Sequence, residues 1–186
     1  MKSETLTDEV IKEERKLFKY ILASSFFFFV GTVHGVLQIQ PPIRAYLDSI
    51  GSPYGGPGHM IDPLAHAHIN VIGGVVLLCM AVSYYLVPRL TGVRLFSTKL
   101  INYTFWFTAL GITGFYSTLL IFGIIEGDLL LAGKAEELQA VHAYYKPTIA
   151  TVSTIMGMGF WVFFANMFMT AKNVYGTWRT ERKNGN

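Results

Sequence analysis

The chain has 186 residues, of which 52% are hydrophobic and 15% are aromatic, while only 15% carry a charge. This composition, with its charges gathered in a few blocks, is typical of a membrane protein, and no nucleic-acid partner is expected. Residues 20–43, 63–88, 100–125 and 147–171 contain no Asp, Glu, Lys or Arg. Because about 20 apolar residues cross a bilayer, these windows predict an all-α membrane protein with four transmembrane helices.

The basic residues predict how the helices are oriented. Twelve of the fifteen lie at the end of the expected bundle that carries both termini, and three lie at the other end. Because basic segments stay on the cytoplasmic side, both termini are predicted to be cytoplasmic. Residues 1–19 then form a cytoplasmic surface segment, residues 20–172 a four-helix transmembrane domain, and residues 173–186 a basic cytoplasmic tail.

The first predicted helix contains His34 between Gly31 and Gly35. The two glycines clear one face of the helix, which could admit a neighbouring helix or a flat cofactor. His34 is predicted to lie late in this helix, toward the outer face of the membrane. An ionisable side chain at such a position is costly and indicates a cofactor site, a proton route or an ion path.

The segment between the first two windows is rich in proline and glycine and includes His59. Its length and aromatic content predict an ordered cap over the outer end of the bundle. Asp62 is predicted to cap the free amides of the second helix, with Pro63 in the first helical position. A hydrogen bond from Asp62 to a histidine is the alternative.

The second predicted helix begins with His66 and His68. Residues two apart on a helix are turned by about 200°, so the two rings leave opposite flanks and cannot bind one metal ion together. They can serve two different sites, although hydrogen-bonded structural histidines are the alternative. Cys79 is the only cysteine, so the chain contains no intrachain disulfide.

The last two windows contain glycine, threonine and serine but no charged residue, and His142 precedes the fourth. All five histidines are therefore expected toward the outer face. Gly157 and Gly159 belong to a small polar stripe suited to helix packing. Because no charged residue interrupts any window, we expect no proton translocation by this chain alone.

Several motifs in this order resemble the C-terminal four helices of the catalytic subunit of C-family (cbb-type) haem–copper oxidases and nitric oxide reductases. They are HAH at 66–68, a glycine pair at 73–74, YYLVPRLTG at 84–92, KLIN at 99–102 and HAYY at 142–145. The resemblance implies that His66 ligates a high-spin haem and His68 a low-spin haem. The family's second low-spin ligand and its metal-B histidines have no counterpart here, so the chain is not expected to be catalytically complete by itself.

Three functions remain open. The first is a membrane b-type cytochrome that carries electrons from a quinol or soluble donor within a respiratory-type complex. In it His34 and His68 would bind one haem b, which is non-covalent because the chain has no Cys-x-x-Cys-His motif. The second is one part of a split oxidase or nitric oxide reductase, with a further haem on His66. The third is a non-redox subunit whose histidines, including the secondary candidates His59 and His142, bind copper or zinc, or only pack.

The opposed directions of His66 and His68 also predict assembly. At least one ring must face lipid or a neighbour, and lipid is the costly choice. We expect a homo-oligomer, with a trimer as the leading hypothesis, or a place among other membrane subunits. Two glycine pairs, Gly31/Gly35 and Gly157/Gly159, are the candidate contacts.

Overall fold

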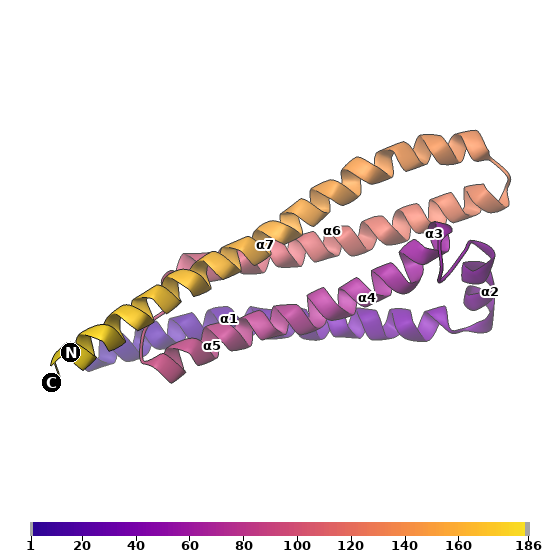
Figure 1. Cartoon of the computed structure of the whole chain (residues 1–186). Helices are drawn as coiled ribbons and strands as arrows, with labels where there is room; N and C mark the ends of the chain where they lie inside the picture. The colour runs from indigo at the N-terminus through magenta and orange to yellow at the C-terminus, as the bar shows by residue number, and fades with distance from the viewer. Residues whose placement is uncertain (1, 185–186) are drawn as a thin grey trace.

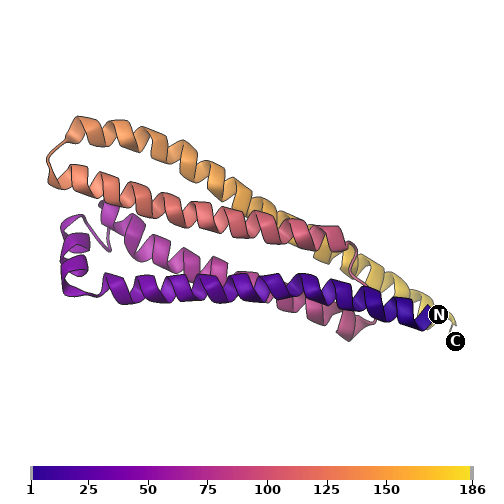
Figure 2. The same ribbon diagram turned by 180° about the vertical axis from the view of Figure 1, so that it is seen from behind.

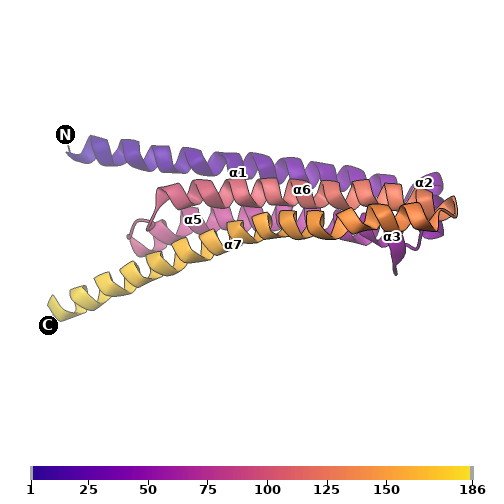
Figure 3. The same cartoon turned by 90° about the horizontal axis from the view of Figure 1, so that it is seen from above.

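The computed structural model describes residues 2–184. The described chain is all-helical, and the prediction of four helices able to cross a membrane is confirmed. The spans are Arg15–Gln38, Gly56–Thr91, Thr98–Leu131 and Ala135–Thr180. They form a long bundle with both termini at the same end (Figures 1 and 3).

The bundle consists of two antiparallel helical hairpins. In the first, α1 (Lys2–Gln38) is followed by the short α2 (Pro41–Ser49) and by the second crossing. The second crossing consists of α3 (Gly56–His59), the π-helical η1 (Met60–Ala65), α4 (His66–His68), the π-helical η2 (Ile69–Val76) and α5 (Leu77–Thr91). The second hairpin is formed by α6 (Thr98–Leu131) and α7 (Ala135–Asn184), and the two hairpins lie against each other (Figures 1 and 2).

The second crossing begins earlier than the sequence predicts. Its first helical residue is Gly56, with Pro57 in the first turn, and a break at Asp62 divides the crossing so that Pro63 begins the stretch after the break. Proline is tolerated there because its missing N–H would be unpaired in any case. The crossing ends at Gly92, which adopts the left-handed conformation (φ 68°) that glycine accepts without steric cost.

Helical backbone also continues across the boundaries expected at residues 19 and 172. In the described chain α1 runs without a break from Lys2 to Gln38, and α7 runs from Ala135 to Asn184. The membrane-spanning part of each helix is therefore extended by its charged segment.

The main hydrophobic core lies between α1, η2, α5 and α6. Buried polar side chains tie the helices together at the end of this core that is near the termini. The Tyr84 and Thr104 hydroxyls are 2.9 Å apart, and the Asn166 side chain bonds both backbone groups of Ser97 at 3.0 Å. Because an unpaired polar group in hydrocarbon is costly, these bonds fix α5, α6 and α7 relative to one another.

The glycine pair of η2 brings the second crossing close to α1. A Cβ atom at Gly73 would lie 2.7 Å from Cγ of Phe27, and one at Gly74 would lie 2.6 Å from Cε1 of Phe28. Any larger residue would push the two helices apart. The pair therefore helps to place the two histidines of α4 beside α1.

Three of the four glycines expected at contacts between copies of the chain are used inside it. A Cβ atom at Gly31 would meet the Asn70 side chain, and one at Gly159 would meet Thr108. Gly35 makes room for a histidine ring, as described below, and only Gly157 has open space around it. The expected role is corrected for Gly31, Gly35 and Gly159, which serve close packing within one bundle, and it stays a prediction for Gly157.

Candidate functional site

His66 and His68 lie in the single α-helical turn between two π-helical segments, η1 and η2. Such segments are rare and occur frequently at functional sites. Within η1 the backbone of Asp62 leaves the helical region, with φ −133° and ψ 114°. The rotation of α4 about its axis is therefore set by irregular backbone on both sides, which sequence periodicity does not reveal.

The His66 ring lies against α1. Its centroid is 5.5 Å from that of His34, with the ring planes at 41°, and its Nδ1 atom is 2.8 Å from Nε2 of Gln38. His34 is 8% exposed, and its Nδ1 atom is 3.3 Å from the Tyr116 hydroxyl of α6. A Cβ atom at Gly35 would lie 3.0 Å from Nε2 of His66, so glycine makes room for this ring. The result is a pair of imidazoles at the junction of α1 and α4.

His68 leaves a different flank of the helix and packs against α6. Its ring centroid is 4.7 Å from that of Phe115. Because His34 and His68 are expected at similar depth in consecutive helices, the sequence predicts that these two residues form a pair. In the structure, the imidazole that contacts His34 is that of His66. Depth alone does not identify the neighbour, because helix rotation decides which ring faces α1.

The hydrogen bond of His68 defines its tautomer. Its Nδ1 atom is 2.8 Å from the carbonyl oxygen of Leu64, one turn earlier. A carbonyl oxygen only accepts, so Nδ1 is the donor, and in the neutral imidazole Nε2 then keeps a lone pair. Histidines that bind metals commonly show this arrangement, with the second ring nitrogen donating to a carbonyl or carboxylate. His68 thus has the ring arrangement that is common in metal-binding histidines.

A cavity of about 340 Å³ opens beside His34. Its polar lining comes from His34, Gln38 and Tyr116, and the rest is apolar side chains of α1, α2, η1 and α6. Oε1 of Gln38 is buried and has no hydrogen-bond partner within the described chain. Buried polar atoms are rarely left unpaired, and exchanging the two ends of the Gln38 amide would place this oxygen beside Nδ1 of His66, where it could accept a hydrogen bond.

Possible metal ligands are scattered in the part of the chain that the structure describes. No three His, Cys, Asp or Glu side chains come together in the part of the chain that the structure describes. Besides His59 and His142, the described chain offers His68 by itself and the imidazole pair of His34 and His66. Few protein ligands suffice for haem iron, because the macrocycle supplies the other four nitrogen atoms.

The two secondary candidates have other partners. His59 bonds through Nδ1 to the carbonyl oxygen of Pro53. In His142, Nδ1 is 3.1 Å from both carboxylate oxygens of Glu126, which is 3% exposed. The sequence-based expectations miss this carboxylate–imidazole pair. The short turn between α6 and α7 explains the pair, because it brings residues on its two sides to the same level along the bundle.

The expectation that Asp62 caps the second crossing is wrong. Its carboxylate accepts hydrogen bonds from Nη1 of Arg44 at 2.6 Å and from Oγ of Ser52 at 3.1 Å. Arg44 also binds Asp48 at 2.6 Å, and the bonds to both carboxylates raise its pKa. Both printed partners of the carboxylate are side chains, Arg44 of α2 and Ser52 of the following loop, and neither is a backbone amide of the crossing. The carboxylate instead holds α2 against the backbone break that precedes α4.

A second contact ties the cap to α6 and gives a pH-dependent prediction. The Tyr46 hydroxyl donates to Oδ1 of Asp128 at 2.9 Å, and burial together with this carboxylate raises the pKa of Tyr46 to about 12. The unfolded chain titrates near 10, so the protonated phenol stabilises the fold below about pH 10. This contribution is lost as the pH rises toward about 12.

The measurement is thermal unfolding in detergent as a function of pH. The stability difference between the wild type and Tyr46→Phe is expected to be constant up to about pH 10 and to shrink above it. Because the other tyrosines titrate in both proteins, their contribution cancels in the difference between the wild type and this variant. A difference that stays constant through pH 12 would contradict the assignment.

The fold and its histidines define a multi-pass, all-α membrane protein with imidazoles gathered in the half of the bundle away from the termini. The family model described as Cytochrome C and Quinol oxidase polypeptide I matches residues 4–148. The chain belongs to this family.

Curated relatives agree with this family. Cytochrome c oxidase subunit 1 of Rhodobacter capsulatus is 32% identical over 107 residues, covering 49% of this chain and 20% of that protein. The Cbb3-type cytochrome c oxidase subunit CcoN1 of Stutzerimonas stutzeri is 24% identical over 175 residues, covering 88% of this chain and 32% of that protein. The chain thus spans a third or less of the length of these relatives. It is a respiratory oxidase-related, multi-pass protein of the prokaryotic inner membrane.

Proposed function

We propose that this chain is a b-type cytochrome subunit that carries electrons through histidine-ligated haem within a respiratory-type membrane complex. The observation that carries the proposal is the hydrogen bond of His68, which leaves Nε2 free to bind iron. Membership of an oxidase family supports the same cofactor class. The haem is of the non-covalent b type, since the sequence has no attachment motif.

In this proposal each side chain has a defined task. His68 would hold the haem iron through Nε2, while the Leu64 carbonyl oxygen holds its ring and tautomer. His34 and His66 would be the candidates for a further ligand, to this haem or to a second one; His66 could serve through Nε2 when the Gln38 amide oxygen accepts from its Nδ1. When bound, an iron with two imidazole ligands supplies one-electron transfer. Phe115 packs against the His68 ring and restricts the access of water.

The proposed partners follow from how much of its relatives' length this chain covers. It aligns over most of its own length with a third of a larger oxidase subunit, so we propose that it works beside other membrane subunits or as a homo-oligomer, with a trimer as the leading hypothesis. A quinol or a soluble protein would supply the electrons. Both termini are proposed to face the cytoplasm, because the end that carries them holds twelve of the fifteen basic residues.

One observation favours a second candidate, a part of a split haem–copper oxidase or nitric oxide reductase. The alignment with the CcoN1 subunit covers 88% of this chain. In this case His66 would hold a high-spin haem with an open position. Carbon monoxide would then bind to the reduced complex and shift its Soret band, whereas a haem with two histidine ligands would not respond.

The proposal is tested by the haem content and spectrum of the protein purified in mild detergent. The wild type is expected to show a low-spin reduced-minus-oxidised spectrum of haem b, with the haem released by acidified acetone. His68→Ala should remove the low-spin signal of the haem that His68 holds, because the substitution removes the lone pair of Nε2. His59→Ala is the matched control, since its ring is bonded within the cap, and it should keep the spectrum.

The outcome is decisive in both directions. A low-spin spectrum that survives His68→Ala would overturn the ligand assignment. A wild-type protein that is folded, joined to its native membrane partners and free of haem would overturn the cytochrome function itself. Circular dichroism of each variant separates the loss of haem from the loss of fold.

A further inference from the structure

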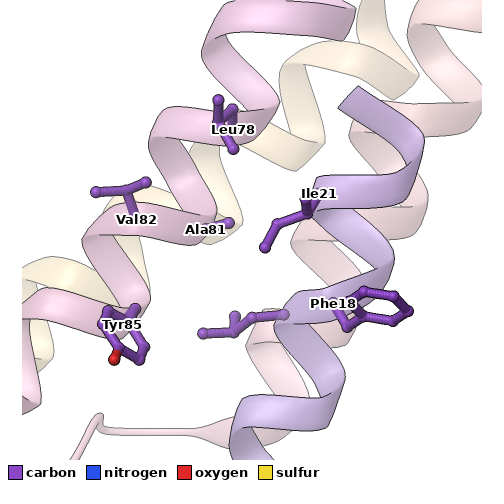
Figure 4. Close-up of a pocket in the computed structure, with 7 residues that line it drawn as sticks. Phe18, Ile21, Leu78, Ala81, Val82 and Tyr85 are labelled. Atoms are coloured by element: carbon purple, nitrogen blue, oxygen red, sulfur yellow. The ribbon is translucent and has the colours of Figure 1, made fainter. Parts of the chain in front are cut away.

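A groove of about 280 Å³ runs between α1 and α5, at the end of the bundle that carries the termini. Figure 4 shows its lining, in which Ile21 of α1 and Ala81 of α5 face the gap between the two helices. Leu17 and Ala81, 8% and 3% exposed, lie at its base. The groove plays no part in the candidate haem site.

The shape of the groove depends on one small residue between larger neighbours. Ala81 leaves a hollow, while the exposed side chains of Phe18, Val82 and Tyr85 form its rim. From Leu78 to Tyr85 it follows α5 for about 10 Å. The lining has almost no polar groups, and an apolar hollow of this kind does not hold ordered water. Within a bilayer, an alkyl chain of lipid fits this space.

Positive charge lies at the end of the groove nearest the membrane surface. Arg15 and Lys16 immediately precede Leu17, and the guanidinium of Arg89 lies 4.1 Å from the ring centroid of Tyr85. This end of the bundle contains twelve Lys and Arg residues against six Asp and Glu, whereas the other end contains three against six. Basic residues beside a membrane helix attract anionic headgroups, and Arg binds phosphate with charge-assisted hydrogen bonds.

We propose that this groove binds one anionic phospholipid, with an acyl chain along Ala81 and the phosphate beside Lys16 and Arg89. The apolar hollow selects a hydrocarbon chain, and the charge at its end selects a negative headgroup. The site is independent of haem binding, so it stands or fails separately from the proposed function.

The test is native mass spectrometry of the purified full chain, titrated with phosphatidylglycerol or with phosphatidylcholine of the same acyl chains. The wild type is expected to retain one phosphatidylglycerol and to prefer it over phosphatidylcholine. Ala81→Leu fills the hollow and should remove retention of both lipids. Arg89→Gln should remove the preference for the anionic lipid and keep weak binding of both.

Matched controls use positions outside the groove. Ala165→Leu adds the same atoms to an exposed site on α7, and Arg179→Gln removes one charge from the same end of the bundle. Both should bind phosphatidylglycerol as the wild type does. If Ala81→Leu does not fold, Val82→Phe narrows the groove from its exposed rim and should weaken retention.

Three results would overturn the proposal. The first is equal binding of the two phospholipids that Ala81→Leu leaves unchanged, which would indicate only general contact with membrane lipid. The second is retention of an isoprenoid quinone in place of phospholipid. The third is a dimer that Val82→Phe dissociates, which would assign the groove to a second copy of the chain.

Discussion

Gly111→Ala is expected to force α6 and α7 apart and to destabilise the protein by about 1–3 kcal/mol. A Cβ atom at Gly111 would lie 2.5 Å from both N and Cα of Met156. These are backbone atoms of α7, so no side-chain rotation relieves the overlap. Because α7 packs mainly on α6, the whole helix must shift.

Gly157→Ala is the matched control for this prediction. Gly157 also lies within α7, yet nothing comes within 4 Å of the Cβ atom that alanine would add. Alanine favours helix over glycine, so this variant should be neutral or stabilised by up to about 1 kcal/mol. The measurement is the free energy of unfolding in mixed micelles, followed by circular dichroism. Equal stability of the two variants would refute the close contact at Gly111.

Arg44→Met is expected to destabilise the cap by about 1–3 kcal/mol, because it leaves the Asp62 carboxylate without its counter-charge. The Asp62 side chain is only 13% exposed and lies 2.6 Å from the guanidinium. A half-buried carboxylate that loses its main donor is costly, since Ser52 alone cannot replace the charge. The variant should also lower haem retention, because Asp62 holds the backbone break that precedes α4.

Two further variants isolate this interaction. Lys134→Met removes an exposed ion pair with Glu137, and such pairs contribute about 0–1 kcal/mol. Adding Asp62→Asn to Arg44→Met removes the unpaired charge and should restore part of the lost stability. If Arg44→Met cost no more than Lys134→Met, or if the double variant were less stable than the single one, the ion pair would have no structural role.

The Glu126–His142 pair shows what hairpin geometry adds to a sequence. The two residues are not adjacent in the sequence, and neither has an obvious partner close to it there. The three-residue turn between α6 and α7 brings them together and buries the carboxylate. Sequence spacing predicts such a pair only when the turn between two helices is located to within a residue or two.

Several features of this protein are determined by its sequence alone. The four crossings follow from hydrophobicity and from the absence of charge over about 20 residues, which are local properties of a segment. The order of the motifs is sufficient to recognise the oxidase family. The Pro- and Gly-rich segment after the first helix predicts an ordered cap, and in the structure Leu47, Ile50 and Ile61 form a small core there.

Only the tertiary structure decides which side chains meet. His34 contacts His66, and Asp62 binds Arg44. The space beside Gly31 is occupied by a side chain of the same chain. Each of these contacts depends on the rotation of a helix about its axis. In the second crossing two π-helical segments and a backbone break set that rotation. Their positions result from packing against α1, α2 and α6, which no periodic pattern in the sequence records.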